Sequence, residues 1–193
     1  MIIIPTSAEI DLKKDQRTQE YLKTISWLKE NIIHPIHWLE CVSNHSFIEE
    51  YYPVYYSNTH QPHFFNKGAN LGLALKSFFD NIEIKENLVV QMTGRYYFTS
   101  THFFDVIEKY PQYDLYVKNT GGQYFTGCFA MKTNIFKKWL NQTDWIELNN
   151  QMKNIEMSLY EFSIEENLDV FEFDKLYMDC NIFGSGIIDK ITI

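Results

Sequence analysis

Length, composition and charge place this chain among ordinary globular proteins. It has 193 residues, 45% hydrophobic and 22% charged, which excludes a disordered or collagen-like chain. This length is typical of one domain and buries enough surface to fold without a disulfide or metal. The net charge is −8 and no basic stripe is present, so nucleic acid is excluded as an expected partner.

The cysteines and apolar runs indicate the expected compartment. Cys41, Cys128 and Cys180 are far apart and form no CxxC pair, so we expect reduced core thiols rather than a disulfide or zinc site. The apolar run at residues 2–4 is too short for a signal peptide, and no stretch approaches the roughly 20 apolar residues that cross a bilayer. We therefore expect a cytoplasmic protein with no transmembrane segment.

The predicted elements alternate between short apolar strands and amphipathic helices. The first strand covers residues 2–4, and apolar residues at helical spacing predict a helix from about residue 16 to 32. The next predicted strands are, in chain order, 36–42, 53–57, 88–92, 114–117 and 124–131. The next predicted helices cover residues 66–79, 100–109, 135–140 and one long helix at 148–162. Residues 170–183 are expected to return to the sheet, and 184–186 to turn out of it.

This alternation predicts an α/β fold with a mostly parallel central sheet flanked by helices. Ligands of such sheets bind beyond the carboxyl ends of the strands. The strand ends therefore place Thr6, Glu40, residues 66–70 and the Thr93-Gly94-Arg95 segment at one candidate site.

Three features of that site have a chemical and a structural interpretation. Arg17 and Arg95 are the only arginines, and Arg95 follows a strand-end glycine where a guanidinium can grip phosphate, although a surface ion pair explains it equally. Residues 66–70 open a helix whose N–H groups favour anions, or they form an ordinary helix cap. Glu156 lies beside an apolar helical stripe, so it is either a proton acceptor at a cleft edge or an exposed helix glutamate.

Taken in order, these segments resemble small GT-A-type glycosyltransferases of the bacterial and viral kind that carry a K-I/L-T-G-R-Y block. The most specific block is residues 90–96, although Gln91 stands where the family usually has lysine. The other similar segments are the helix from Arg17 to Leu28, the strand that ends in Glu40, the N-K-G helix start at Asn66, residues 125–131, and the helix that bears Glu156.

The resemblance implies one GT-A-like (Rossmann-like) domain over residues 1–193, with a nucleotide-sugar half at about 1–100 and an acceptor half at about 101–193. It also implies transfer of a sugar from a UDP-, GDP- or similar sugar nucleotide to a glycan or other hydroxyl acceptor. In that scheme Arg95 stabilises the leaving diphosphate and Glu156 is the base, if the mechanism inverts. The implied donor-binding residues are Thr6, Arg17, Glu40, Asn66, Lys67, Gly68, Thr93, Gly94 and Tyr96. Thr126 and Gly127 are implied on the acceptor side.

The sequence departs from GT-A enzymes at the metal site. Such enzymes hold Mg²⁺ or Mn²⁺ with a DxD motif, and the chain has Thr93-Gly94-Arg95 there and no DxD elsewhere. Either Arg95 and Lys67 take the place of a metal, or separated acids such as Asp179 hold one. Two alternatives to an active glycosyltransferase stay open: a non-catalytic sugar-nucleotide or glycan binding module on the same fold, and a nucleotidyltransferase, for which a glycine-rich loop after the first strand is missing.

Overall fold

The computed structural model describes residues 1–7, 14–181 and 190–193. The seven strands of its central sheet lie in the order β3-β2-β1-β4-β7-β6-β8. Their bounds are Ile2–Thr6 (β1), Ile36–Glu40 (β2), Val54–Tyr56 (β3), Leu88–Met92 (β4), Leu115–Val117 (β6), Cys128–Lys132 (β7) and Val170–Glu172 (β8). All neighbouring pairs are parallel except those that β7 makes with β4 and β6. The predicted α/β fold with a mostly parallel central sheet is confirmed.

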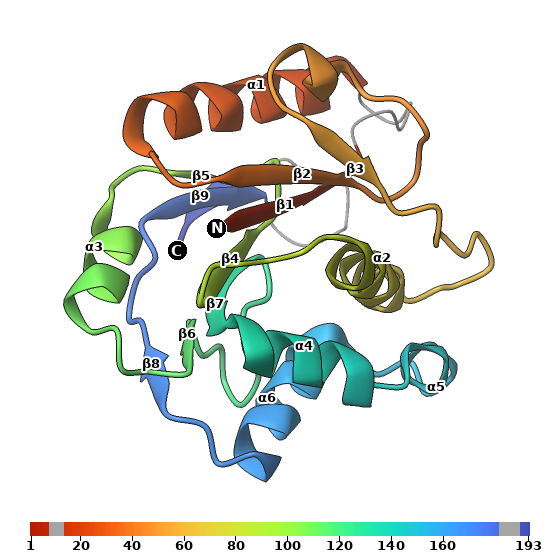
Figure 1. Ribbon diagram of the computed structural model, residues 1–193, viewed down its shortest axis with the longest axis vertical. Coiled ribbons are helices and arrows are strands. Elements are labelled where there is room, and N and C mark those ends of the chain that lie inside the picture. Colours follow the sequence, from red (N-terminus) through yellow and green to blue (C-terminus); the bar gives the residue numbers. More distant parts are fainter. Residues whose placement is uncertain (8–13, 182–189) are drawn as a thin grey trace.

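Helices cover both faces of the sheet (Figure 1). They are α1 (Lys14–Asn31), α2 (Lys67–Asn81), α3 (His102–Lys109), α4 (Thr133–Gln142), α5 (Trp145–Asn150) and α6 (Ile155–Glu165), with a 3-10 turn at Phe47–Glu50. A small second sheet joins β5 (Tyr97–Phe98), β9 (Met178–Asn181) and β10 (Lys190–Thr192) on the side of α1.

The strand sequences explain why both faces are covered. Successive side chains of a strand point to opposite faces, and the strands are apolar at almost every position. In β1, Ile2 and Ile4 pack into a core with α1 and α3, whereas Ile3 packs into a second core with α2, α4, α5 and α6. The two cores sandwich the sheet.

The predicted long helix at residues 148–162 is wrong, because the segment forms two helices. Asp144 caps α5, Asn154 caps α6, and Met152 between them has a left-handed backbone with φ of 56°. The helical spacing persists across the break because Leu148 and Ile155 pack into the same core. An Asp or Asn side chain that accepts the free N–H groups of a first turn can start a new helix even where the apolar spacing is continuous.

The other strand predictions hold with shifted ends. The strand predicted at 124–131 begins at Cys128, and Tyr124 makes an isolated bridge to Asn119 instead. The chain after residue 170 contributes β8 to the central sheet and β9 to the second sheet. The predicted turn at residues 184–186 lies outside the described residues. Among the residues that are described, no helix has both the length and the apolar character needed to cross a bilayer.

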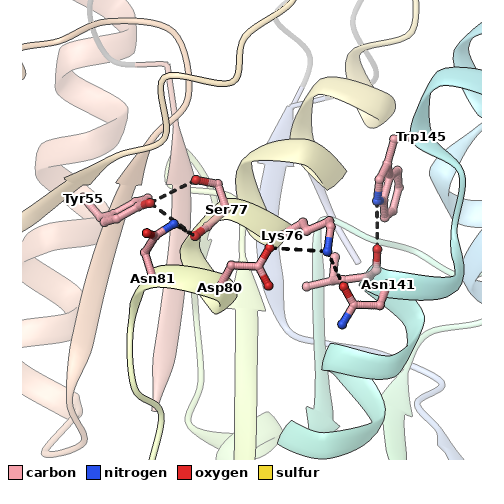
Figure 2. A network of polar contacts seen from close by, with 8 residues as sticks. Tyr55, Lys76, Ser77, Asp80, Asn81, Asn141 and Trp145 are labelled. Carbon is pink, nitrogen blue, oxygen red and sulfur yellow. Dashed lines mark hydrogen bonds and ion pairs between the residues drawn. The ribbon is translucent and has the colours of Figure 1, made fainter.

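Helix α2 is tied to its neighbours on both sides (Figure 2). The Tyr55 hydroxyl of β3 lies 3.0 Å from the Ser77 hydroxyl and 3.2 Å from the Ser77 carbonyl oxygen. Lys76 pairs with Asp80 at 3.3 Å and donates to Asn141 of α4. These contacts hold α2, and hence the loop that precedes it, against the sheet.

Gly72→Ala should destabilise the protein, although alanine normally stabilises a helix by about 1 kcal/mol relative to glycine. A Cβ on Gly72 would lie 2.1 Å from a ring carbon of Trp145, whose indole N–H donates to the Leu140 carbonyl at 3.1 Å. We expect the overpacked helix pair to lose about 1–3 kcal/mol of unfolding free energy in urea titrations. Asn81→Ala, at the exposed end of the same helix, is the control, and a Gly72→Ala protein as stable as the wild type would contradict the packing.

Candidate functional site

The carboxyl ends of the parallel strands form one edge, and most of the residues singled out from the sequence lie there. Thr6 ends β1 opposite Glu40, which ends β2. β4 runs parallel to β1 and ends at Met92, which is paired with Cys128 at the start of antiparallel β7. The edge therefore collects the segments after β1, β2 and β4 and the segment before β7.

Gly94 makes the turn after β4 by close packing. Its N–H donates to the Pro5 carbonyl at 3.2 Å. A Cβ there would lie 2.7 Å from a Tyr21 ring carbon and 2.9 Å from one of Trp38. Only glycine fits between these rings without displacing them, so Gly94 brings the next residue, Arg95, over the end of β1.

Arg95 is held at this edge by α1. Its Nη1 lies 3.6 Å from Oε2 of Glu20, whose side chain is 6% exposed, whereas the Arg95 side chain is 29% exposed. The Thr24 hydroxyl, one turn further along α1, donates to the Tyr96 carbonyl at 3.0 Å. The guanidinium is therefore oriented from behind by a buried carboxylate while part of it stays open to a ligand.

Arg17 braces the segment that follows β1. Its Nη2 donates to the Ser7 carbonyl at 2.5 Å, and the Ser7 N–H donates to the Tyr21 hydroxyl at 3.1 Å. Burial raises the pKa of the Tyr21 phenol, and both Arg17 and Arg95 oppose that rise. The two arginines thus act on the same phenol and lie on the same side of the sheet edge.

Glu40 and Thr6 are buried within the edge. Thr6 is 3% exposed and Glu40 is fully buried. Oε1 of Glu40 accepts the N–H groups of Val42 at 3.0 Å and Ser43 at 3.3 Å. Through these two hydrogen bonds the carboxylate stabilises the backbone turn after β2.

The start of α2 is a helix cap that also joins α2 to α6. Oδ1 of Asn66 accepts the Gly68 N–H at 2.9 Å, and its Nδ2 donates to the Lys153 carbonyl at 2.5 Å. A Cβ on Gly68 would lie 2.8 Å from Cγ2 of Ile155. Asn66 and Gly68 are thus used for capping and packing, whereas the neighbouring Lys67 side chain is exposed.

Glu156 lies in the first turn of α6, where residues of the segment before β7 contact it. Its Oε1 accepts the Thr126 hydroxyl at 2.8 Å, and its carbonyl accepts the Tyr124 N–H at 3.3 Å. The carbonyl of the residue after Thr126, Gly127, accepts the Thr93 N–H at 2.8 Å. Since Gly68 touches the residue before Glu156, these contacts place residues 66–68, 93–96, 126–127 and 156 at one edge of the molecule.

Tyr96 follows Arg95 and packs its ring against the segment before β7. Its ring stacks on Phe125 with 6.1 Å between centroids. Burial is the main cause that raises the pKa of the Tyr96 phenol, with Cys180 and Glu156 acting in the same direction and Arg95 opposing them. The charges of Arg95 and Glu156 thus have opposite effects on the pKa of this phenol.

Asp179 and the three cysteines are the candidates for a metal ligand or a reactive thiol. Among the described residues, no group of three or more His, Cys, Asp or Glu side chains could hold a metal ion. Asp179 lies in β9 and accepts the Tyr97 hydroxyl at 2.9 Å. Cys128 and Cys180 are buried thiols, and burial raises the pKa of Cys180 to about 11.

Two cavities lie away from this edge. One of about 360 Å³ is lined by Met1, Leu88 and Phe104 at the amino ends of the strands, and one of about 230 Å³ lies among α4, α5 and α6. The sequence did not indicate Glu20 or Thr24 as parts of the edge, and it marked Gln91 only as a departure from the K-I/L-T-G-R-Y block, without its contact to Thr126. No local pattern marks these contacts, because the partners Arg95, Tyr96 and Thr126 lie far away in the chain.

The chain matches no protein-family model and no curated protein. Several solved structures share its fold. A cytidylyltransferase from Leptospira borgpetersenii superposes with a TM-score of 0.59 and 11% identity, over 100% of this chain and 80% of that one. A protein assigned as a nucleotide-diphospho-sugar transferase from Desulfovibrio desulfuricans has a TM-score of 0.57 and 13% identity, over 89% and 78%.

Mouse xyloside xylosyltransferase 1, in its apo form, has a TM-score of 0.52 and 7% identity, over 90% of this chain and 83% of that one. At these identities the comparisons show a shared fold. The chain therefore has the fold of nucleotide-sugar and nucleotidyl transferases.

Proposed function

We propose that the protein is a glycosyltransferase that moves a sugar from a nucleotide-diphosphate donor to a hydroxyl group of a glycan or similar acceptor. One observation supports the proposal: in segments at the carboxyl-end edge of the sheet, the Arg95 guanidinium pairs with Glu20 and the Glu156 carboxylate accepts the Thr126 hydroxyl. A cation and a base at one edge are what transfer from a diphosphate leaving group requires.

The proposed reaction assigns one task to each group. Glu156 accepts the proton of the acceptor hydroxyl, whose oxygen forms a bond to the anomeric carbon of the donor sugar. The bond from that carbon to the diphosphate breaks, and Arg95 stabilises the negative charge that the leaving oxygen gains. This order of events inverts the anomeric configuration.

The remaining edge residues are proposed to bind the donor. Thr6, Arg17 and Glu40 shape the nucleoside end, and the exposed Lys67 contacts the diphosphate. Thr93, Gly94 and Tyr96 place Arg95. We assign Thr126 and Gly127 to the acceptor side of the site. We further propose one domain, in which residues 1–100 hold the sugar nucleotide and residues 101–193 complete the acceptor side.

A cytidylyltransferase is the second candidate, because one such enzyme superposes with a TM-score of 0.59. It would release pyrophosphate from a nucleoside triphosphate rather than a nucleoside diphosphate from a sugar nucleotide. The segment that follows β1, Ser-Ala-Glu-Ile-Asp-Leu-Lys, has no glycine, whereas a backbone cradle for a triphosphate favours glycine. A non-catalytic module on this fold would bind the same ligands without turnover.

A thermal-shift screen of UDP- and GDP-sugars, with and without Mn²⁺, tests the proposal. A donor present at 100 times its dissociation constant should stabilise the protein by about 2.7 kcal/mol. The donor so identified should then release its nucleoside diphosphate on incubation with the protein. Binding without any release would support the non-catalytic module, and pyrophosphate release from CTP with a sugar phosphate would support the cytidylyltransferase. A shift that appears only with Mn²⁺ would show that the donor is held through a metal.

A further inference from the structure

A chain of buried polar contacts runs from the centre of the sheet to Glu156. Gln91, near the end of β4, is fully buried, and only one of the two orientations of its amide satisfies both polar atoms. In that orientation the amide nitrogen donates to the Thr126 carbonyl at 2.8 Å. Thr126 is 4% exposed, and its hydroxyl donates to Oε1 of Glu156 at 2.8 Å. Three side chains from β4, the segment before β7 and α6 are thus connected in series.

The position of Gln91 calls for a reason. Its neighbours in β4, Val90 and Met92, are apolar and buried, and an apolar residue would fill this place without the cost of desolvating an amide. That cost is recovered only where the amide is hydrogen-bonded. Here the amide nitrogen donates to the Thr126 carbonyl, and the amide oxygen accepts the Met92 N–H at 3.3 Å. Gln91 therefore determines where Thr126 sits along the edge of the sheet.

Thr126 in turn determines which oxygen of Glu156 is open. A threonine hydroxyl has one proton to donate, and here it is directed to Oε1. Among the described residues no hydrogen bond reaches Oε2, and Glu156 is half-buried rather than fully exposed. One oxygen is thus held, and the other stays able to accept a proton from a hydroxyl group at the edge.

We infer that Thr126 and Gln91 are positioning residues that orient the Glu156 carboxylate so that Oε2 accepts the proton of the acceptor hydroxyl. The inference rests on the proposed function, because it concerns the base of that reaction. The proton moves from the acceptor oxygen to Oε2 while Oε1 keeps the bond from Thr126. Thr126 therefore acts through Glu156 rather than on the acceptor itself.

The test compares Thr126→Val, which has nearly the same shape and no hydroxyl, with Thr126→Ser, which keeps the hydroxyl. A charge-assisted hydrogen bond contributes about 1.5–3 kcal/mol, so Thr126→Val should lower kcat for diphosphate release by roughly 10- to 100-fold. The KM for the sugar nucleotide should not change, because the donor is bound elsewhere on the edge. Thr126→Ser should recover most of the lost rate, which a purely structural role would not predict.

A second readout needs no turnover. In protein labelled with ¹³C at the glutamate side-chain carboxyls, Thr126→Val should shift the Glu156 signal, assigned by its loss in Glu156→Gln, and leave the signal of exposed Glu165 in place. Thr126→Ser should restore it. An unshifted Glu156 signal, or a shifted signal with normal kcat in Thr126→Val, would overturn the inference. A wild-type protein that binds donors but never turns them over would instead overturn the proposed function, and the positioning role in transfer with it, while the carbon signal would still report the contact.

Discussion

Replacing Arg95 with alanine is expected to lower the rate of nucleoside diphosphate release by roughly 10²- to 10³-fold, the usual cost of removing one donor to a developing oxyanion. The structure supports this because the guanidinium is partly exposed at the strand ends while Glu20 holds it from behind. Arg95→Lys keeps the charge without the planar fork, so it should recover only part of the rate. The measurement is steady-state release of diphosphate from the donor found in the screen.

Stability must be followed in the same experiment. A surface arginine would be removed at little cost, but Arg95 pairs with a carboxylate whose side chain is 6% exposed. Removing Arg95 takes an opposite charge away from a carboxylate that is almost fully buried, so Arg95→Ala should also lower the melting temperature. Adding Glu20→Gln to Arg95→Ala should restore much of the stability and none of the rate. If Arg95→Ala keeps wild-type turnover, the role proposed for Arg95 is wrong.

Glu156→Gln should remove the base and lower kcat by roughly 10²- to 10⁴-fold, the range that general base catalysis contributes. The amide has the shape of the carboxylate, and its oxygen still accepts the Thr126 hydroxyl, so folding and donor binding should not change. Steady-state kinetics with the same donor measures the loss, and thermal shift with that donor measures binding.

Glu165→Gln is the matched control for this variant, because Glu165 is exposed at the end of the same helix. It should have wild-type kcat. A Glu156→Gln protein with the same kcat as Glu165→Gln would show that Glu156 is not the base.

Much of the fold could be predicted from local patterns. Apolar runs such as the one in β1 can only be buried between two layers, and the helical spacing in α1 identifies one of those layers. The rule that ligands bind at the carboxyl ends of parallel strands then selected Thr6, Glu40 and the Thr93–Arg95 turn, which the structure does place along one edge. The break between α5 and α6 escaped prediction because the apolar spacing continues across it and both helices pack into one core.

By itself the sequence determined the alternation of strands and helices, the glycine turn after β4 and the position of Arg95 just beyond it, since periodicity and turn chemistry act over a few neighbouring residues. Only the tertiary structure decided that β7 runs antiparallel between β4 and β6, that Glu20 pairs with Arg95, and that Thr126 joins Gln91 to Glu156. These pairs are brought together by the packing of helices and strands that are distant in the chain. The local sequence pattern around a residue does not depend on which distant residue it contacts. The orientation of the site residues therefore follows from the tertiary structure and not from a local motif.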